Sequence, residues 1–292
     1  MKVHHINCGS LCPWGGPLID GFSYTPGAHL SCHCLLIETD GSGLVLVDTG
    51  LSLRETDPVR PTLARFHQML DRPKVNPDEC AINTVRRLGF DPRDVRHIIA
   101  THLDFDHVGG IRDFPQAMVH VTTIEYQDAR HARGFIQKRR YSNVPFDEHQ
   151  HWSFYEANGD RWYGFQSVRD LKGLPPDILL IPLRGHTLGQ VGVALEQPNG
   201  WLFHAGDAYL YRGEMDRSGR RCPIGMRLYE RMLDADHEAR VANQERLRHL
   251  MQEHSDEIRI FCSHDRKEFE ALTGQSGHIY SSDQAVPRTA HP

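Results

Sequence analysis

The apolar residues of this chain fall into short runs that glycine, proline or polar clusters interrupt. Residues 33–38 and 44–47 are β-prone and flank a glycine-containing turn, which predicts a β-hairpin. Residues 77–88 place apolar side chains on one helical face, and the glycine that follows predicts the end of that helix. Residues 97–100 predict the next strand, so strands and helices alternate early in the chain.

The later apolar runs extend the same pattern. Thr122, with Glu125 three residues further on, predicts a helix start, and this helix should run to about residue 132. Residues 225–253 are rich in helix formers and predict one long helix or two consecutive ones. Further strands are predicted at residues 117–121, 177–182, 190–196, 201–205 and 259–262. Strands that alternate with helices are typical of an α/β fold.

The alternation stops between residues 134 and 176, where aromatic side chains accumulate. The segment contains Phe135, Tyr141, Phe146, Trp152, Phe154, Tyr155, Trp162, Tyr163 and Phe165. We interpret it as an insertion in a single domain that spans residues 1–292. Aromatic residues suit a lid over an apolar ligand, and they are equally enriched at dimer interfaces. A lid and a homodimer interface therefore both stay open.

Composition excludes several classes of partner. The chain has 292 residues, of which 38 are acidic and 33 basic, for a formal net charge of −5. These charges are well mixed along the sequence, so the basic face that nucleic acid requires is not indicated. Apolar runs such as residues 178–181 are too short to span a bilayer, and the first residues lack the apolar region of a signal peptide. We expect a cytoplasmic protein that binds neither nucleic acid nor membrane.

The seven cysteines form an odd number scattered over a long chain, which is typical of reduced thiols. Cys32 and Cys34 flank a histidine, but no second cysteine pair follows at the spacing of a zinc finger. Because apolar residues continue this run, we favour a structural role on a strand, and the same role for Cys8 and Cys12. Most of the 20 histidines, including His67, lack a companion at ligand spacing, so packing or surface exposure is their expected role.

The densest polar cluster directly follows the apolar residues 98–100. It contains His102, Asp104, Asp106 and His107, all of which can bind metal. A strand that ends here would lead into a tight loop on which these side chains converge, and the glycine pair that follows would permit a sharp turn. The pattern predicts a metal centre.

Three further ligand-type residues also follow predicted strands. They are His186, Asp207 and His264, each on a predicted loop near a small residue. Chance is a sufficient explanation for any one of them alone. For all seven side chains, in this order and at successive strand ends, a shared metal site is the simpler explanation.

The motif at residues 102–107, followed by a distant His, an Asp and a last His, resembles the metallo-β-lactamase superfamily, whose signature is His-x-His-x-Asp-His. The order and approximate spacing of the motifs agree over residues 33–265. The resemblance implies an αββα sandwich, in which two mixed β-sheets are flanked by helices. It also implies a dinuclear metal site at the ends of the strands.

The resemblance assigns a role to each residue of the site. It implies one metal ion held by His102, Asp104 and His186, a second held by Asp106, His107 and His264, and Asp207 as the bridge between them. Asp48, in the Asp-Thr-Gly after the predicted hairpin, matches the family's buried carboxylate, which orients a metal-bound histidine. Two divalent ions are therefore implied, with zinc as the first choice.

Asp104 departs from the family pattern, because most members have histidine at this position. An anionic oxygen is a harder ligand than imidazole, so the site should tolerate manganese or iron better than a nitrogen-rich one. A carboxylate here is also similar to the diiron oxidoreductase branch, which carries a fused flavin-binding domain for which this chain has no length. An iron-dependent oxidoreductase stays an alternative, as does a ligand-binding protein that has lost turnover through Asp104.

Hydrolysis is the expected reaction, because two divalent ions lower the pKa of a bridging water and polarise the bond under attack. Asp106 could also transfer a proton to the leaving group. The loops expected at residues 7–10 and 13–16, and the sequence 205–209 around Asp207, are similar to the N-acyl homoserine lactonase branch, in which a tyrosine contacts the substrate carbonyl. Tyr209 and Tyr211 are the candidates for that contact. We expect a lactone or carboxylic ester with an apolar moiety, and hydrolysis of a thioester, phosphoester or β-lactam is the alternative.

Overall fold

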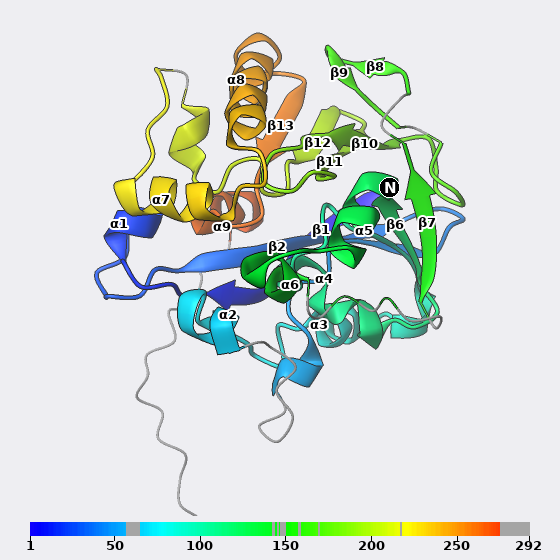
Figure 1. Cartoon of the computed structure of the whole chain (residues 1–292). Helices are drawn as coiled ribbons and strands as arrows, with labels where there is room; N and C mark the ends of the chain where they lie inside the picture. The colour runs from blue at the N-terminus through cyan, green and yellow to red at the C-terminus, as the bar shows by residue number, and fades with distance from the viewer. Residues whose placement is uncertain are drawn as a thin grey trace, which may run out of the picture.

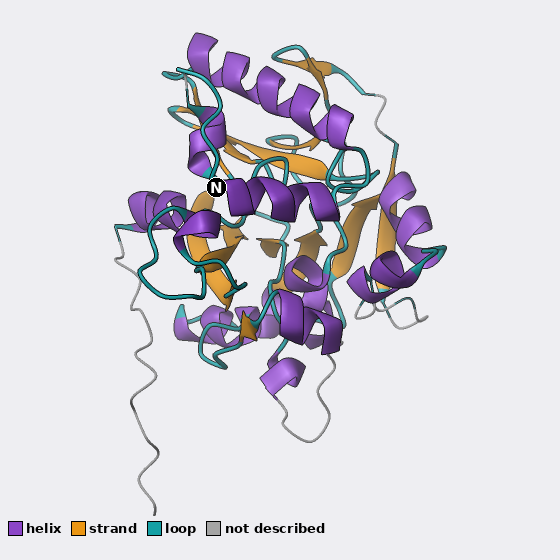
Figure 2. Ribbon diagram, turned by 60° about the vertical axis from the view of Figure 1, so that its left-hand side comes forward, coloured by secondary structure: helices purple, strands orange, loops and turns teal. Residues whose placement is uncertain are grey.

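Two β-sheets lie face to face in the computed structural model of the chain, and helices cover the outer face of each (Figure 1). Figure 2 shows the strands at the centre and the helices around them. The structure describes residues 1–56, 65–141, 144, 146, 150–156, 159–168, 170–216 and 218–274. Within these residues the predicted α/β architecture, with two mixed sheets flanked by helices, is confirmed.

The first sheet has seven strands in the order β4-β1-β2-β3-β5-β6-β7. They are β4 (Pro73–Lys74), β1 (Lys2–Leu11), β2 (Leu30–Glu38), β3 (Leu44–Val47), β5 (Val95–Ile99), β6 (Met118–Thr122) and β7 (His151–Tyr155). Strands β4 to β3 pair antiparallel, whereas β3, β5, β6 and β7 pair parallel. The parallel half of this sheet brings the carboxyl ends of β3 and β5 to one edge.

The second sheet has four strands in the order β10-β11-β12-β13. They are β10 (Ile178–Pro182), β11 (Val191–Gln197), β12 (Gly200–His204) and β13 (Ile258–Phe261). Only the β12–β13 pair is parallel. A separate two-stranded hairpin is formed by β8 (Arg161–Trp162) and β9 (Phe165–Gln166).

The helices lie outside the two sheets and between the strand ends. They are α1 (Pro17–Asp20), α2 (Arg65–Leu70), α3 (Ala81–Arg87), α4 (Phe105–Val108), α5 (Thr123–Arg130), α6 (Phe135–Arg140), α7 (Ile224–Leu233), α8 (His237–Glu253) and α9 (Arg266–Thr273). Short 3₁₀ turns occur at Leu53–Thr56, Pro92–Asp94, Gly109–Asp113 and Arg212–Met215. The long helix α8 covers the second sheet (Figure 1).

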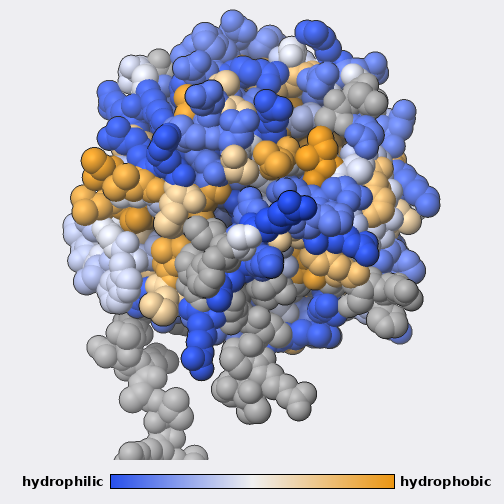
Figure 3. All heavy atoms as spheres, in the orientation of Figure 1, coloured by the Kyte–Doolittle hydropathy of each residue, from blue (hydrophilic) through white to orange (hydrophobic). Residues whose placement is uncertain are grey.

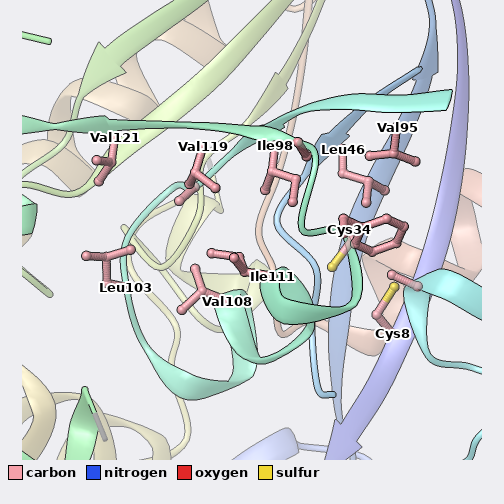
Figure 4. Packing of buried hydrophobic residues seen from close by; sticks show 14 of the residues in the cluster. Cys8, Cys34, Leu46, Val95, Ile98, Leu103, Val108, Ile111, Val119 and Val121 are labelled. Carbon is pink, nitrogen blue, oxygen red and sulfur yellow. The ribbon is translucent and has the colours of Figure 1, made fainter. Parts of the chain in front are cut away.

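The alternation of side chains along each strand builds the layers of the core. In β2, Leu35 and Ile37 pack between the two sheets, where they meet Phe261 of β13. Cys34 and Leu36 pack on the opposite face, in a cluster that includes residues of α3 and α5. Figure 4 shows Cys34 in this cluster. Both faces of β2 are therefore buried, which explains why its sequence is a continuous apolar run rather than an alternating one.

The strands and helices that the sequence predicted are present, with differences at their ends. The hairpin is confirmed as β2 and β3, and the helix start at Thr122 is confirmed because its hydroxyl accepts a hydrogen bond from the Glu125 N–H. The helix predicted at 77–88 begins only at Ala81, since residues 77–80 form turns. The segment 225–253 forms two helices, α7 and α8.

The first strand was missed, and the loop expected at residues 7–10 was wrong. These residues belong to β1, which pairs with β2 along nearly its whole length. The register of that pairing shifts between Asn7 and Ser10, where Gly9 has a φ of 119°. The irregularity, together with the histidines and asparagine of β1, hides the period of two that a strand normally shows.

The segment 134–176 contributes to both sheets. Strand β7 extends the edge of the first sheet, and Trp162 and Phe165 of the β8–β9 hairpin are buried against the second. Tyr141 is also buried, whereas Phe154 keeps 47% of its surface exposed. The side chain of Phe135 lies outside the described part of the structure, as do residues 275–292.

Exposed apolar side chains gather where α1 meets α7, toward the left of Figure 3. They are Leu18, Ile224, Leu228 and Met232, and the last three recur at a helical spacing of four. No helix in the described part of the chain is both long and apolar enough to cross a membrane.

Candidate metal centre

The loop after β5 is held in place by its apolar residues. Leu103, Val108 and Ile111 pack into the core beneath the first sheet (Figure 4). The polar residues that flank them in the sequence must then point away from that core, toward the gap between the sheet edges. His102, Asp104, Asp106 and His107 all do so, and all four are buried. The packing of the loop thus turns a row of polar residues into one cluster.

His186, Asp207 and His264 complete the cluster from the second sheet. They follow β10, β12 and β13, and each is at most 3% exposed. The structure therefore brings together all seven side chains that the sequence predicted. They form two overlapping groups, which we call the His264 position (Asp106, His107, His264 and Asp207) and the His186 position (His102, Asp104, His186 and Asp207).

The donor atoms of the His264 position have the spacing that a tetrahedral metal ion requires. Donors bound about 2.0–2.1 Å from a tetrahedral zinc ion lie about 3.3 Å from one another. Here Nε2 of His264 lies 3.2 Å from Nε2 of His107, 3.3 Å from Asp106 and 3.2 Å from Oδ2 of Asp207. Nε2 of His107 lies 3.3 Å from Oδ1 of Asp207 and 4.0 Å from Asp106, so one separation is longer than the rest. The residues present therefore fit a divalent ion.

The His186 position has a similar spacing. Asp104 lies 3.3 Å from Nε2 of His102 and 2.9 Å from Nε2 of His186, which in turn is 3.4 Å from Asp207. One feature distinguishes this position, because the guanidinium of Arg140 bonds to both Asp104 and His186. The sequence analysis missed Arg140.

The hydrogen bonds of the histidines aim their Nε2 atoms at the cluster. Nδ1 of His107 donates to Asp48 over 2.8 Å, and Nδ1 of His264 donates to the Ser31 carbonyl over 2.6 Å. Nδ1 of His102 donates to the Thr101 hydroxyl, which itself donates to Asp48. With Nδ1 protonated in all three rings, the Nε2 lone pairs are free for a metal ion.

Asp48 is linked to two of these histidines, directly to His107 and through Thr101 to His102. It directly follows β3, and its φ of 57° lies in the left-handed region, which aspartate tolerates better than most residues. Its carboxylate accepts hydrogen bonds from the Thr101 N–H, the Thr101 hydroxyl and His107. Burial would raise the pKa of Asp48, but the attraction of His107 outweighs it and lowers that pKa.

Charge is concentrated in a buried volume. Burial would raise the pKa of Asp207, but His264 and His107 hold it well below its ordinary value. Burial dominates at Asp106 and raises its pKa. Burial would lower the pKa of His107, yet the carboxylates of Asp207 and Asp48 raise it well above its usual range. The carboxylates thus favour positive charge at the centre of the cluster, which is what a metal cation supplies.

Glu125 links the loop that carries His102 to the loop that carries His186 through hydrogen bonds. The sequence predicted only that Glu125 belongs to a helix-capping motif. One of its oxygens accepts from the Leu103 N–H over 2.9 Å and the other from the Gly189 N–H over 3.1 Å. At Gly189 a Cβ atom would lie 2.2 Å from the Glu125 nitrogen, so only glycine fits this contact. Burial raises the pKa of Glu125 to about 7.

A cavity opens beside the metal donors. It is lined by Asp104, Asp106, Arg140, His186, Asp207 and His264, together with His67, Asp71 and Tyr229 and the apolar side chains of Leu11, Leu30, Phe105, Leu210 and Leu233. The Tyr229 hydroxyl donates to Asp71 over 2.5 Å, and His67 bonds the other oxygen of Asp71 over 2.7 Å. His67, for which we expected only packing or surface exposure, thus belongs to the wall of the cavity.

Neither tyrosine singled out from the sequence lines this cavity. Tyr209 is fully buried, and its hydroxyl donates to Glu268 over 3.0 Å. Tyr211 is partly buried beside Gly21, and Arg212 lies over its ring. The tyrosine that lines the cavity is Tyr229 of α7. It was not named from the sequence, because a tyrosine shortly after Asp207 was expected.

The four cysteines assigned to structural positions, Cys8, Cys12, Cys32 and Cys34, are all buried with free thiols. One of them, Cys32, is nevertheless close to the cluster. Its Sγ lies within 4.8 Å of donor atoms of Asp106 and His264. Burial raises the pKa of this thiol well above its usual range, so Cys32 presents a neutral thiol to the His264 position.

Similarity to known proteins agrees with this geometry. The sequence profile of the metallo-β-lactamase superfamily matches residues 27–258. A probable metallo-hydrolase of Mycobacterium tuberculosis is 38% identical over 267 residues, which cover 91% of this chain and 80% of that protein. An N-acyl homoserine lactonase of Bacillus thuringiensis is 32% identical over 116 residues, which cover 39% of this chain and 46% of the lactonase.

The fold resembles solved lactonase structures. One is an N-acyl homoserine lactone hydrolase with the product N-hexanoyl-L-homoserine bound at its catalytic metal centre. It aligns with a TM-score of 0.68 and 21% identity, over 92% of this chain and 95% of that chain. At this identity the likeness concerns the fold alone.

The chain therefore belongs to the metallo-β-lactamase superfamily, as its motifs implied. Within that superfamily it is a metallo-hydrolase. Members of the superfamily use divalent metal ions, and the spacing of the donor atoms described above fits such ions.

Proposed function

We propose that this metallo-hydrolase opens a lactone or cleaves a carboxylic ester, with N-acyl homoserine lactones as the first substrates to test. The observation that carries the proposal is the convergence of seven buried donors, five of which line a cavity that also has apolar walls. The N-acyl homoserine lactonases among its relatives support this choice of bond. An apolar wall beside a few aimed polar groups suits an acyl chain attached to a polar ring.

The proposed ligands are those that the geometry brings together. His102, Asp104, Asp106, His107, His186, Asp207 and His264 are the proposed donors, and Asp48 is the proposed orienting carboxylate. Zinc is the proposed ion, and manganese or iron are the alternatives because three of the donors are carboxylates. Divalent ions bound here would supply Lewis acidity and lower the pKa of water, so hydrolysis needs no serine or cysteine nucleophile.

The chain's own residues would bind the substrate and move the proton. Asp106 lies at the cavity beside the other proposed donors, so its carboxylate is placed to pass a proton to the leaving oxygen. Tyr229 takes the place that we expected for Tyr209 or Tyr211. Its hydroxyl reaches the cavity, and the contact with Asp71 fixes its direction. To contact the substrate carbonyl, Tyr229 would have to turn its one hydroxyl hydrogen from Asp71 toward that oxygen.

A substrate panel tests which bond is cut. The metal-loaded protein would be assayed with N-hexanoyl homoserine lactone, aryl esters, a thioester, a phosphotriester and a β-lactam. We expect the highest kcat/KM on the lactone or the carboxylic esters. Preference for a thioester, phosphotriester or β-lactam would assign another bond to the same site. Redox activity with iron, or ligand binding without turnover, would contradict the proposal.

Two variants complete the assay. Asp106→Asn should lower kcat by about 100-fold or more, because it removes both a donor and the proton carrier. Asp256→Asn removes an exposed carboxylate from a distant turn and should leave kcat unchanged. Equal activity of the two variants would show that hydrolysis occurs elsewhere.

A further inference from the structure

Arg140 is a buried cation at the His186 position. It is the last residue of α6, and only 6% of its surface is exposed. Nε and Nη2 donate to the two carboxylate oxygens of Asp104, and Nη2 also donates to Nε2 of His186. Nη1 donates to the Leu233 carbonyl at the end of α7 over 2.7 Å. All three nitrogens of the guanidinium are therefore engaged.

The hydrogen bond from Arg140 occupies the lone pair on Nε2 of His186 that a metal ion would need. Nε2 of His186 also lies 2.9 Å from Asp104, to which it could donate only if it carried the proton. Arginine does not lose its proton in proteins, so the contact with Nη2 requires Nε2 of His186 as the acceptor. A neutral imidazole has one lone pair for this purpose. Nε2 of His186 can therefore bind Arg140 or a metal ion, but not both at once.

The contact with Asp104 is of the strongest kind available to arginine. The two parallel N–H groups of a guanidinium match the two oxygens of a carboxylate, and such paired contacts are stronger than single neutral hydrogen bonds. A histidine, the usual residue of the family at this position, could not accept this two-point contact. Asp104 and Arg140 thus form a matched pair in a site that would otherwise hold a metal ion.

The charges of the buried side chains in the cluster also favour a single metal ion. Asp104, Asp106 and Asp207 bring three buried carboxylates into the cluster. Arg140 neutralises one of them, and a single divalent ion at the His264 position would neutralise the other two. Arg140 also places a fixed positive charge beside the His186 position, where it would repel a second divalent ion in a site that water screens poorly.

We propose that Arg140 takes the place of a metal ion at the His186 position, so that the chain binds one divalent ion tightly at the His264 position. A second ion would bind only where Arg140 releases His186. This inference rests on the proposed metal centre and concerns its stoichiometry. It also assigns Arg140 a direct role, since its guanidinium lines the cavity and can supply positive charge to a substrate oxygen in place of the second ion.

Metal titration measures the stoichiometry without reference to activity. The chelator-treated full chain would be titrated with zinc by calorimetry, and bound metal would be counted after gel filtration by elemental analysis. We expect one tightly bound ion per chain, with any second ion about 100-fold weaker, because its binding must break charge-assisted hydrogen bonds of Arg140. Arg140→Met removes those donors and should bring the second site to within about 10-fold of the first.

Lys138→Met is the matched control, because it removes one positive charge from an exposed position of the same helix. It should keep the wild-type stoichiometry. Two equally tight ions in the wild type would overturn the inference, and this measurement stands even if Arg140→Met does not fold. An unchanged single site in folded Arg140→Met would overturn it as well. Absence of tight zinc binding in every variant would instead overturn the proposed metal centre itself.

Discussion

The protonation of the histidines in the metal cluster depends on the groups that accept hydrogen bonds from their Nδ1 atoms. Asp48 accepts from His107 and from Thr101, and Thr101 in turn accepts from His102. One carboxylate therefore determines which nitrogen carries the proton in two rings, one at each proposed metal position. Residues that orient ligands in this way commonly affect metal affinity nearly as much as the ligands do.

Asp48→Asn tests this dependence. The side-chain amide would present an N–H toward at least one group that now donates to Asp48, so the rings should lose their fixed protonation. We expect metal affinity to fall by about 10–100-fold. Asparagine tolerates a positive φ, so the backbone at this position should be unaffected. Zinc titration is the measurement, and Asp40→Asn, at an exposed turn, is the control. Equal affinity of both variants would refute the role of Asp48.

Arg140 shows why part of the site was hidden in the sequence. The seven donors could be predicted because each of them follows an apolar strand in a recognisable order. Arg140 is the last of three basic residues, 138–140, on a short helix in the aromatic insertion. Such a run is typical of a solvated helix face. Only the packing that brings α6 beside the end of α7 turns its last side chain inward.

At the scale of elements, the site depends on how its loops are anchored. Leu103 alternates with His102 and Asp104, and it packs into the core while they face the other metal donors. The apolar runs allowed the strands and the loop to be predicted. The first strand, β1, was missed because the shift at Gly9 and its polar residues break the alternation.

Leu103→Ala tests this anchoring. Removal of a fully buried leucine side chain should cost about 2–5 kcal/mol of unfolding free energy, because it leaves a cavity in the core. The loop should also lose its fixed position, so zinc affinity should fall together with stability. Urea unfolding and zinc titration measure the two effects. Ile124→Ala, at a side chain that is 50% exposed, should change stability by less than about 0.5 kcal/mol. Loss of stability without loss of zinc affinity would contradict the anchoring role.

At the scale of the whole molecule, a buried carboxyl makes stability depend on pH. Glu268 of α9 accepts from the Cys262 N–H and the Tyr209 hydroxyl, and burial raises its pKa to about 8. The folded state therefore holds this proton at pH values where the unfolded chain has released it. The corresponding stability is complete below the pKa of an unfolded glutamate and is lost as the pH rises toward 8.

Glu268→Gln should remove this dependence. Between pH 5 and 8 the wild type should lose up to about 1.4 kcal/mol of unfolding free energy per pH unit through this group, and the variant should lack that slope. Urea unfolding of chelator-treated protein across this range is the measurement. Glu253→Gln, at an exposed position of α8, should retain the wild-type slope. Parallel pH profiles for all three proteins would show that Glu268 titrates normally.

We propose that this superfamily member hydrolyses a lactone or ester at the metal centre, with one divalent ion bound tightly at the His264 position. The most direct test follows the opening of N-hexanoyl homoserine lactone while zinc is added back to chelator-stripped protein. We predict no turnover before zinc is added and a rate that rises with the first equivalent per chain. An equal rate in the stripped protein, or no turnover of any lactone or ester after reloading, would contradict the account.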